Sequence, residues 1–243
     1  MKSREANLDA LRKRLKTAAS PERAKSSARF FKTGPGDYAE GDQFLGITVP
    51  KLRQLARGCV SLSQTDVLAL LRSPFHEERF LALLLLIERF RKGKEETQKQ
   101  IYELYLTHTK FVNNWDLVDT SAPPIVGGFL STQPTKTIQA RLLELASSPL
   151  LWERRIAMIA TLHWIRQGDP HYGLIIAQAL LNDRHDLLQK AVGWMLREIG
   201  KHCGKEWLEA FLTKHISTMG RTTLRYAIEH FPERIRQSYL KAA

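Results

Sequence analysis

One carboxylate, Asp119, stands in a row of residues that are otherwise basic. Each basic member of the row opens an apolar run, and these members are Arg79, Arg155, Lys190 and Arg225. With Asp119 included, successive positions are 40, 36, 35 and 35 residues apart. A fixed anion repels phosphate, so it is useful where positive charge develops on a ligand, as on the sugar when a glycosidic bond breaks. The alternative is that Asp116 and Asp119 stabilise a helix N-terminus through its dipole.

Two tryptophans accompany this row. Trp115 precedes Asp119 by four residues and Trp194 follows Lys190 by four, so each shares a helix face with its neighbour. A surface of cations and aromatic rings suits nucleic acid, because cations attract phosphate and rings pack on sugars or bases. The alternatives are that the tryptophans pack in the core and that Arg154 and Arg155 form surface ion pairs with Glu153 or Glu144.

The elements that position these residues are expected to be helices. Apolar residues recur at helical spacing, strand signals are scarce, and Ser63 to Asp66 resembles a capping box. The pattern predicts an all-α protein of about 12–14 helices without strands. An interval of roughly 35–40 residues is typical of HEAT-like or armadillo-like repeats. An ordinary helical domain with evenly sized helices is the alternative.

The segment that carries Asp119 breaks a local rule of helix formation. Pro123 and Pro124 follow within a predicted helix, where proline costs about 3 kcal/mol or more. Violations of this kind concentrate where function overrides folding. The segment is therefore the first candidate for a functional site.

Composition narrows the class of protein. The 243 residues include 37 Lys and Arg against 25 Asp and Glu, a net charge of +12. Residues 1–60 contribute +7 and residues 181–243 contribute +4, whereas residues 61–120 contribute −1. Basic ends favour a polyanionic partner, with nucleic acid ahead of acidic lipid. The hydrophobic content of 43% excludes a disordered chain.

Several other classes are excluded by the absence of their motifs. The longest apolar run, Phe80 to Ile87, is too short to span a membrane and predicts a buried helix. The chain begins with charged residues where a signal peptide has its apolar core, and its two cysteines are far apart, so a cytoplasmic location is expected. No HExxH motif, Cys/His cluster or phosphate-binding glycine motif occurs, so we expect neither a metal nor a cofactor.

Four blocks of the sequence resemble one family of repair proteins. The blocks are NWDLVD at residues 114–119, LWERRIA at 151–157, QKAVGWMLRE at 189–198, and an N-terminal block made of ARFFKTGPG at 28–36, GDQFLGI at 41–47 and PKLR at 50–53. They are similar to the AlkD-like DNA alkylation repair glycosylases, over residues from about 20 to about 235 of this chain. One block alone is weak evidence, but four in order at plausible spacing are specific.

The resemblance implies a single domain over residues 1–243, an α-solenoid of HEAT-like repeats that cradles duplex DNA in its concave face. It implies a monomeric DNA glycosylase that excises cationic alkylated purines, such as 3-methyladenine and 7-methylguanine, without base flipping. The catalytic residues would be Asp119, which stabilises the sugar cation, and Trp115, which packs against the deoxyribose. The DNA-binding residues would be Trp194, Arg155, Arg197, Lys190, Phe30 and Arg53.

The excision of a cationic purine is also chemically plausible on general grounds, without reference to the family. A purine alkylated at N3 or N7 already carries positive charge and leaves as a neutral base, so one carboxylate and two aromatic faces suffice without a strong general acid. Two residues depart from the family pattern: Phe30 replaces a tyrosine, and Asn114 stands where a second tryptophan can occur. The alternatives are a HEAT-like module that binds DNA without catalysis and a scaffold for an acidic protein partner.

Overall fold

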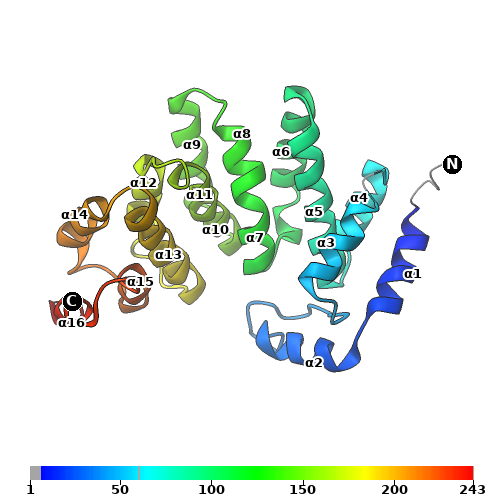
Figure 1. Ribbon diagram of the computed structural model, residues 1–243, viewed down its shortest axis with the longest axis horizontal. Helices are drawn as coiled ribbons and strands as arrows, with labels where there is room; N and C mark the ends of the chain where they lie inside the picture. The colour runs from blue at the N-terminus through cyan, green and yellow to red at the C-terminus, as the bar shows by residue number, and fades with distance from the viewer. Residues whose placement is uncertain (1–6, 60, 243) are drawn as a thin grey trace. The chain divides into compact units, whose positions relative to one another are not determined.

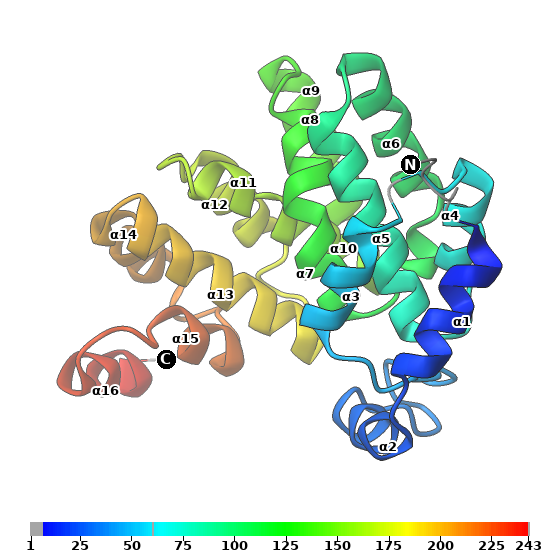
Figure 2. The same ribbon diagram turned by 45° about the vertical axis from the view of Figure 1, so that its right-hand side comes forward.

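The computed structural model describes residues 7–59 and 61–242. Within these residues the chain is helical throughout and has no β-strand, only one isolated bridge between Gln43 and Phe75. The described α-helical segments are numbered α1 to α16, and they form fourteen helices because α8 continues α7 and α11 continues α10. The prediction of an all-α fold is confirmed. Neighbouring helices follow one another in chain order within each unit (Figures 1 and 2).

The chain divides into two compact units, with the boundary after Leu117. In the first unit α1 and α2 precede a long loop, and the remaining helices pack around α5. Their bounds are α1 Leu8–Ala18, α2 Pro21–Phe30, α3 Val49–Arg57, α4 Gln64–Leu71, α5 His76–Lys92 and α6 Glu95–Thr107.

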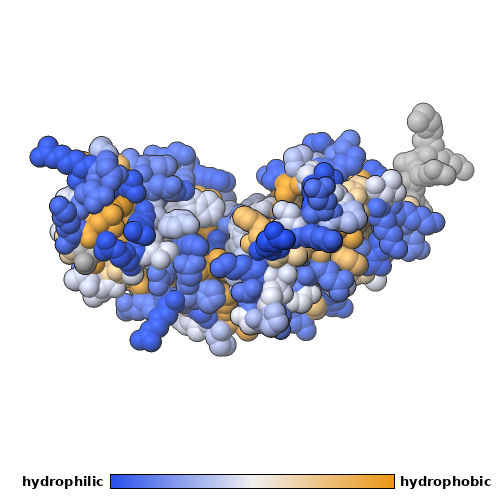
Figure 3. Space-filling view, turned by 90° about the horizontal axis from the view of Figure 1, so that it is seen from below, coloured by the Kyte–Doolittle hydropathy of each residue, from blue (hydrophilic) through white to orange (hydrophobic). Residues whose placement is uncertain are grey.

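The surface of the described residues is mostly polar on the face drawn in Figure 3. No helix among the described residues is long and apolar enough to cross a membrane. The single domain over residues 1–243 stays a prediction.

Helix α5 forms the core of the first unit. Its apolar run from Phe80 to Ile87 is buried except at Leu84, as the sequence predicted, and α3, α4 and α6 pack against it. Helix α4 begins at the predicted capping box: the Asp66 amide donates to the Ser63 hydroxyl, and the Ser63 amide donates to the Asp66 carboxylate. This box satisfies amides that the first turn would otherwise leave unpaired.

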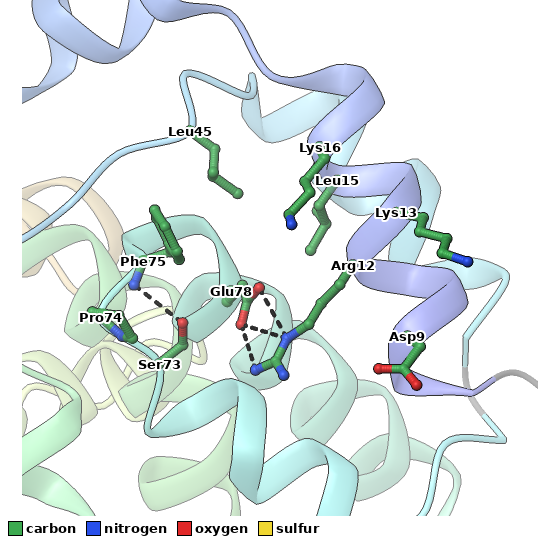
Figure 4. Close-up of a pocket in the computed structure, with 10 residues that line it drawn as sticks. All are labelled: Asp9, Arg12, Lys13, Leu15, Lys16, Leu45, Ser73, Pro74, Phe75 and Glu78. Atoms are coloured by element: carbon green, nitrogen blue, oxygen red, sulfur yellow. Dashed lines mark hydrogen bonds and ion pairs between the residues drawn. The ribbon is translucent and has the colours of Figure 1, made fainter.

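The first residues of α5 form hydrogen bonds and an ion pair with the N-terminal part of the chain. The Glu77 carboxylate accepts hydrogen bonds from the amides of Leu45, Gly46 and Ile47, at 2.8, 2.7 and 3.2 Å. The Arg12 guanidinium of α1 donates to both oxygens of Glu78, beside a cavity of about 480 Å³ (Figure 4). The loop between α2 and α3 is therefore anchored to α5 through its backbone amides.

The second unit consists of helices that pack in consecutive pairs. Helix α9 packs on α10, α12 packs on α13, and α13 also contacts α14 and α15. The bounds are α7 Trp115–Ala122, which crosses the unit boundary, then α8 Gly128–Leu130, α9 Thr135–Ala146, α10 Leu151–Ala160, α11 Leu162–Ile165, α12 His171–Ala179, α13 Asp186–His202, α14 Lys205–His215, α15 Arg221–Ala227 and α16 Glu233–Ala242. At Gly193 a Cβ atom would lie 2.5 Å from the Thr223 carbonyl oxygen, so α13 and α15 pack closely only with glycine there.

Pro123 and Pro124 do not end the helix that carries Asp119. The helix widens into a π turn over Pro123–Gly127 and then continues as α8. A wider turn accommodates proline, which has no amide hydrogen and collides with the carbonyl four residues earlier in a normal α-helix. The two prolines are thus accommodated by a local change from α-helix to π-helix.

The predicted repeat register agrees with the helix boundaries. Asp119, Arg155, Lys190 and Arg225 are each the fifth residue of their helices, α7, α10, α13 and α15, and Arg79 is the fourth residue of α5. The same helix position, or the one before it, therefore recurs on every second main helix from α5 to α15. This is the pattern expected of a helical-repeat protein.

Candidate functional site

The carboxylate of Asp119 is held by Arg155. Arg155 Nε donates to Asp119 Oδ1 at 2.9 Å and Nη2 donates to Oδ2 at 2.8 Å. Two parallel charge-assisted bonds give this pair a fixed geometry that a single hydrogen bond would not. The Arg155 side chain is 5% exposed and that of Asp119 is 16% exposed. Part of the Asp119 side chain therefore remains exposed to solvent.

Arg155 makes a third contact, to α13. Its Nη1 donates to the carbonyl oxygen of Leu187 at 2.5 Å, so one guanidinium joins α7, α10 and α13. The expected partner glutamates are engaged elsewhere, because Glu153 accepts a bond from Ser148 and Glu144 pairs with Arg141. The surface ion pair considered from the sequence is therefore replaced by a buried pair with Asp119. A phosphate contact by Arg155 stays a prediction, while the geometry gives it the role of orienting Asp119.

Trp115 lies in an aromatic cluster of the first unit. Its ring stacks on Phe31 with the centroids 5.4 Å apart and the planes at 28°. Phe30 meets Trp115 edge-on at 6.0 Å and Phe31 edge-on at 5.1 Å. Phe31 also stacks on Phe44 at 5.2 Å. Two predicted site residues, Phe30 and Trp115, are thus brought together from α2 and α7, although 85 residues separate them.

Phe30 is the most exposed large hydrophobic side chain in the described part of the chain. It is 66% exposed, whereas Phe31 behind it is only partly exposed. An exposed ring supported by a stacked cluster can pack against a sugar or base without reordering, which lowers the entropic cost of binding. Sequence reasoning did not single out Phe31, and the signal available for it was its place beside Phe30 in the N-terminal block.

Three predicted DNA-binding residues lie on α13 with acidic partners. Lys190 pairs with Asp186 at 2.6 Å, and Arg197 pairs with Glu229 and with Glu198. The partly exposed Trp194 donates its indole N–H to Glu198 at 3.0 Å. Lys190 and Arg197 are therefore both paired with carboxylates in this structure.

Arg79 does not act as an exposed member of the basic row. Its side chain is 4% exposed, and its Nη2 donates to Asp42 at 2.7 Å while Nη1 donates to the carbonyl oxygens of Ser73 and Pro74. The expectation of a free cation at this position is wrong. A guanidinium taken out of water needs such partners, and the loop after α2 supplies the carboxylate.

Arg53 lines a basic groove between α3 and α5. The groove encloses about 460 Å³, and its polar lining residues are Arg53, Arg57, Glu88, Arg91 and Lys92. Lys92 pairs with Glu88 at 2.8 Å, and Arg53 and Arg57 are exposed. Sequence reasoning named Arg53 alone, and the four-residue spacing of Arg53 and Arg57 was the signal for the second arginine. Among the described residues, no group of three or more potential ligands could hold a metal ion.

The structure is thus that of an all-α repeat protein in which Arg155 fixes the carboxylate of Asp119. The model of the DNA alkylation repair enzyme family matches residues 11–231. The chain therefore belongs to this family, whose members repair alkylation damage in DNA. No curated protein matches it by sequence.

Solved structures share the fold. A predicted DNA alkylation repair enzyme from Enterococcus faecalis superimposes with a TM-score of 0.67 at 16% identity, covering 88% of this chain and 97% of that one. AlkD2 from Streptococcus mutans gives a TM-score of 0.55 at 17% identity, with 93% and 99% coverage. At these identities the two structures establish the helical-repeat fold and nothing finer.

Proposed function

We propose that this chain is a DNA glycosylase that hydrolyses the N-glycosidic bond of cationic alkylated purines in duplex DNA. The observation that carries the proposal is the Asp119 carboxylate, held at both oxygens by Arg155 and still partly exposed. Trp115 lies one turn before it on α7. A fixed negative charge beside an aromatic face suits a sugar that becomes cationic in the transition state.

The reaction needs little from the protein beyond this charge. The bond between C1′ and the purine nitrogen breaks, and its electron pair neutralises the positive charge of the alkylated ring. Water adds to C1′ and loses a proton to solvent, leaving a free base and an abasic site. Asp119 stabilises the sugar cation and orients the water, because its charge is already in place and no dipole must reorganise. A neutral adduct lacks the charged leaving group and reacts poorly.

The aromatic residues supply the contacts to the sugar and backbone. Trp115 and Trp194 pack against the deoxyribose and its backbone, and the exposed Phe30 extends the surface offered by Trp115. The resemblance to AlkD-like proteins favours a lesion that stays stacked in the duplex. Lys190, Arg197 and Arg53 contribute phosphate contacts.

A DNA-binding module without catalysis is the second candidate. The observation that favours it is the same ion pair, since Arg155 offsets the charge of Asp119 and a buried pair of this kind can be purely structural. Release of a free base distinguishes a glycosylase from a module that only binds DNA.

The test is incubation of the purified protein with a duplex that contains 7-methylguanine. We expect the free base to appear with an equal amount of abasic site, and no release from the same duplex carrying hypoxanthine, a neutral base. Chromatography measures the base and cleavage at the abasic site measures the product strand. Binding of the duplex without release of either 7-methylguanine or 3-methyladenine would establish the binding module instead.

The basic groove of the first unit should contribute to DNA affinity through charge alone. Removing Arg53 and Arg57 together (Arg53→Ala, Arg57→Ala) is expected to weaken duplex binding equally for different sequences. The slope of log K against log salt should become shallower by about 0.9 for each phosphate that the protein no longer neutralises. Fluorescence anisotropy at several salt concentrations measures it.

The matched control for this double variant removes two exposed cations elsewhere, Lys136 and Lys214. Equal slopes for the two double variants would place the groove off the DNA. A smaller slope only for the Arg53 and Arg57 variant would confirm it as a phosphate-binding surface.

A further inference from the structure

His76, the first residue of α5, is buried between two carboxylates. Its Nε2 lies 2.8 Å from Asp116 Oδ2 and its Nδ1 lies 3.3 Å from Asp42 Oδ2, and its side chain is 4% exposed. Carboxylates accept hydrogen bonds and do not donate them. When both carboxylates are ionised, hydrogen bonds to both of them require a hydrogen on each ring nitrogen, and the ring is then an imidazolium cation.

The charges around His76 support the cation. Burial alone lowers the pKa of His76, but the hydrogen bonds to Asp116 and Asp42 raise it to about 9, against a smaller opposing effect of the Arg79 charge. Burial raises the pKa of Asp42, yet the bond to His76 and the charge of Arg79 bring it below its ordinary value. Asn114 also reaches Asp42, at 3.4 Å, so two anions, two cations and one amide form the cluster.

The same ring supports the aromatic cluster that holds Trp115. The His76 ring lies 4.9 Å from the Phe31 centroid and stacks on Phe44 at 4.8 Å. Phe31 in turn stacks on Trp115. His76 thus reaches Trp115 along two routes, one through the ring of Phe31 and one through Asp116, the next residue in the chain.

We propose that His76 is a positioning residue, which in its imidazolium form fixes the first turn of α7 and the ring of Trp115 for contact with damaged DNA. The inference rests on the proposed function and names a residue through which that site is held. A neutral imidazole has one N–H, so it can donate to only one of the two carboxylates. The other carboxylate would be left buried without that donor, and Asp116 or the loop at Asp42 would move.

The direct test is the replacement His76→Gln, whose amide can serve only one carboxylate where the ring serves two. We expect single-turnover release of 7-methylguanine to fall roughly 10–100-fold, because a displacement of about 1 Å at a reacting group has effects of that size. Affinity for undamaged duplex should stay within about twofold, since phosphate contacts lie elsewhere. His171→Gln, at an exposed histidine, is the matched control.

Nuclear magnetic resonance of the imidazole nitrogens tests the proposal without activity. In the intact protein the His76 ring should remain doubly protonated at about pH 7.5, because its pKa is raised to about 9. Asp42→Asn should lower that titration point, and the emission of Trp115, obtained as the difference from Trp115→Phe, should change with the same midpoint as His76. This readout also serves if His76→Gln does not fold.

The outcomes separate the inference from the proposed function. Any of three results would overturn the positioning role. His76 would titrate near its ordinary pKa of about 6.5, the emission of Trp115 would stay constant as His76 titrates, or His76→Gln would keep full activity. Absence of base release by the wild-type protein would remove the proposed function, while the titration and the emission would still show whether His76 holds Trp115.

Discussion

Replacing Asp119 with asparagine is expected to slow release of 7-methylguanine by roughly 10²–10³-fold, the usual effect of removing one preorganised charge from a transition state. The amide keeps the shape and one acceptor, but its NH2 group cannot accept the second bond from Arg155, so the change removes the negative charge and one of the two hydrogen bonds. Duplex binding should persist or tighten, because the carboxylate repels phosphate. Single-turnover rates with enzyme in excess, measured beside anisotropy, separate the two effects.

Asp183→Asn is the matched control for this variant. Asp183 forms a similar pair with Arg154 at 2.8 Å in the same unit, with side-chain exposures of 13% and 20%. Both variants disturb an arginine–aspartate pair, so both should lower the melting temperature, but only Asp119→Asn should lose base release. Equal release by Asp119→Asn and the wild type would remove Asp119 from the chemistry.

Replacing Arg155 with alanine is the change expected to cost the most stability. Removing one partner of a buried ion pair is destabilising by about 3–5 kcal/mol, because the other charge is left without compensation. The Leu187 carbonyl is also left without this donor, and the link from α10 to α13 is broken. Chemical denaturation measures the change in unfolding free energy. Base release should fall as well, since Asp119 is no longer held.

The neighbouring Arg154 provides the control for Arg155. Arg154 pairs with Asp183 and donates to the carbonyls of Ser148 and Pro149, whereas Asp119 is held by Arg155. Arg154→Ala should therefore be less stable while it keeps base release per folded molecule. Arg155→Lys should restore only part of the activity, because an ammonium cannot make the parallel bonds of a guanidinium.

The salt dependence of Arg155→Ala decides whether Arg155 also binds phosphate. If its guanidinium serves only Asp119 and Leu187, the slope of log K against log salt should equal that of the wild type. A slope that is shallower by about 0.9 would add a phosphate contact to its role. Either slope is compatible with the fall in base release that we expect.

Local patterns in the sequence were sufficient for the helices and their register. Apolar spacing and capping residues act over three or four positions, so they predict where helices begin and which residues share a face. Asp119, Arg155, Lys190 and Arg225 fall at the same place in every second main helix, as the repeat interval indicated. The buried run of α5 also follows from such local patterns.

The partners of the charged side chains came from the three-dimensional packing. Arg155 occupies the same helix position as Lys190 and Arg225, and Arg79 lies one residue earlier in its own helix. Both arginines are nevertheless buried against aspartates, Asp42 and Asp119, which lie 37 and 36 residues away. His76 likewise meets Asp42 and Asp116, which lie 34 and 40 residues away in the sequence. Residue type and periodicity describe one helix at a time, whereas an ion pair depends on which distant segments meet. At two positions of the basic row, the arginines therefore form ion pairs with distant aspartates and are themselves buried.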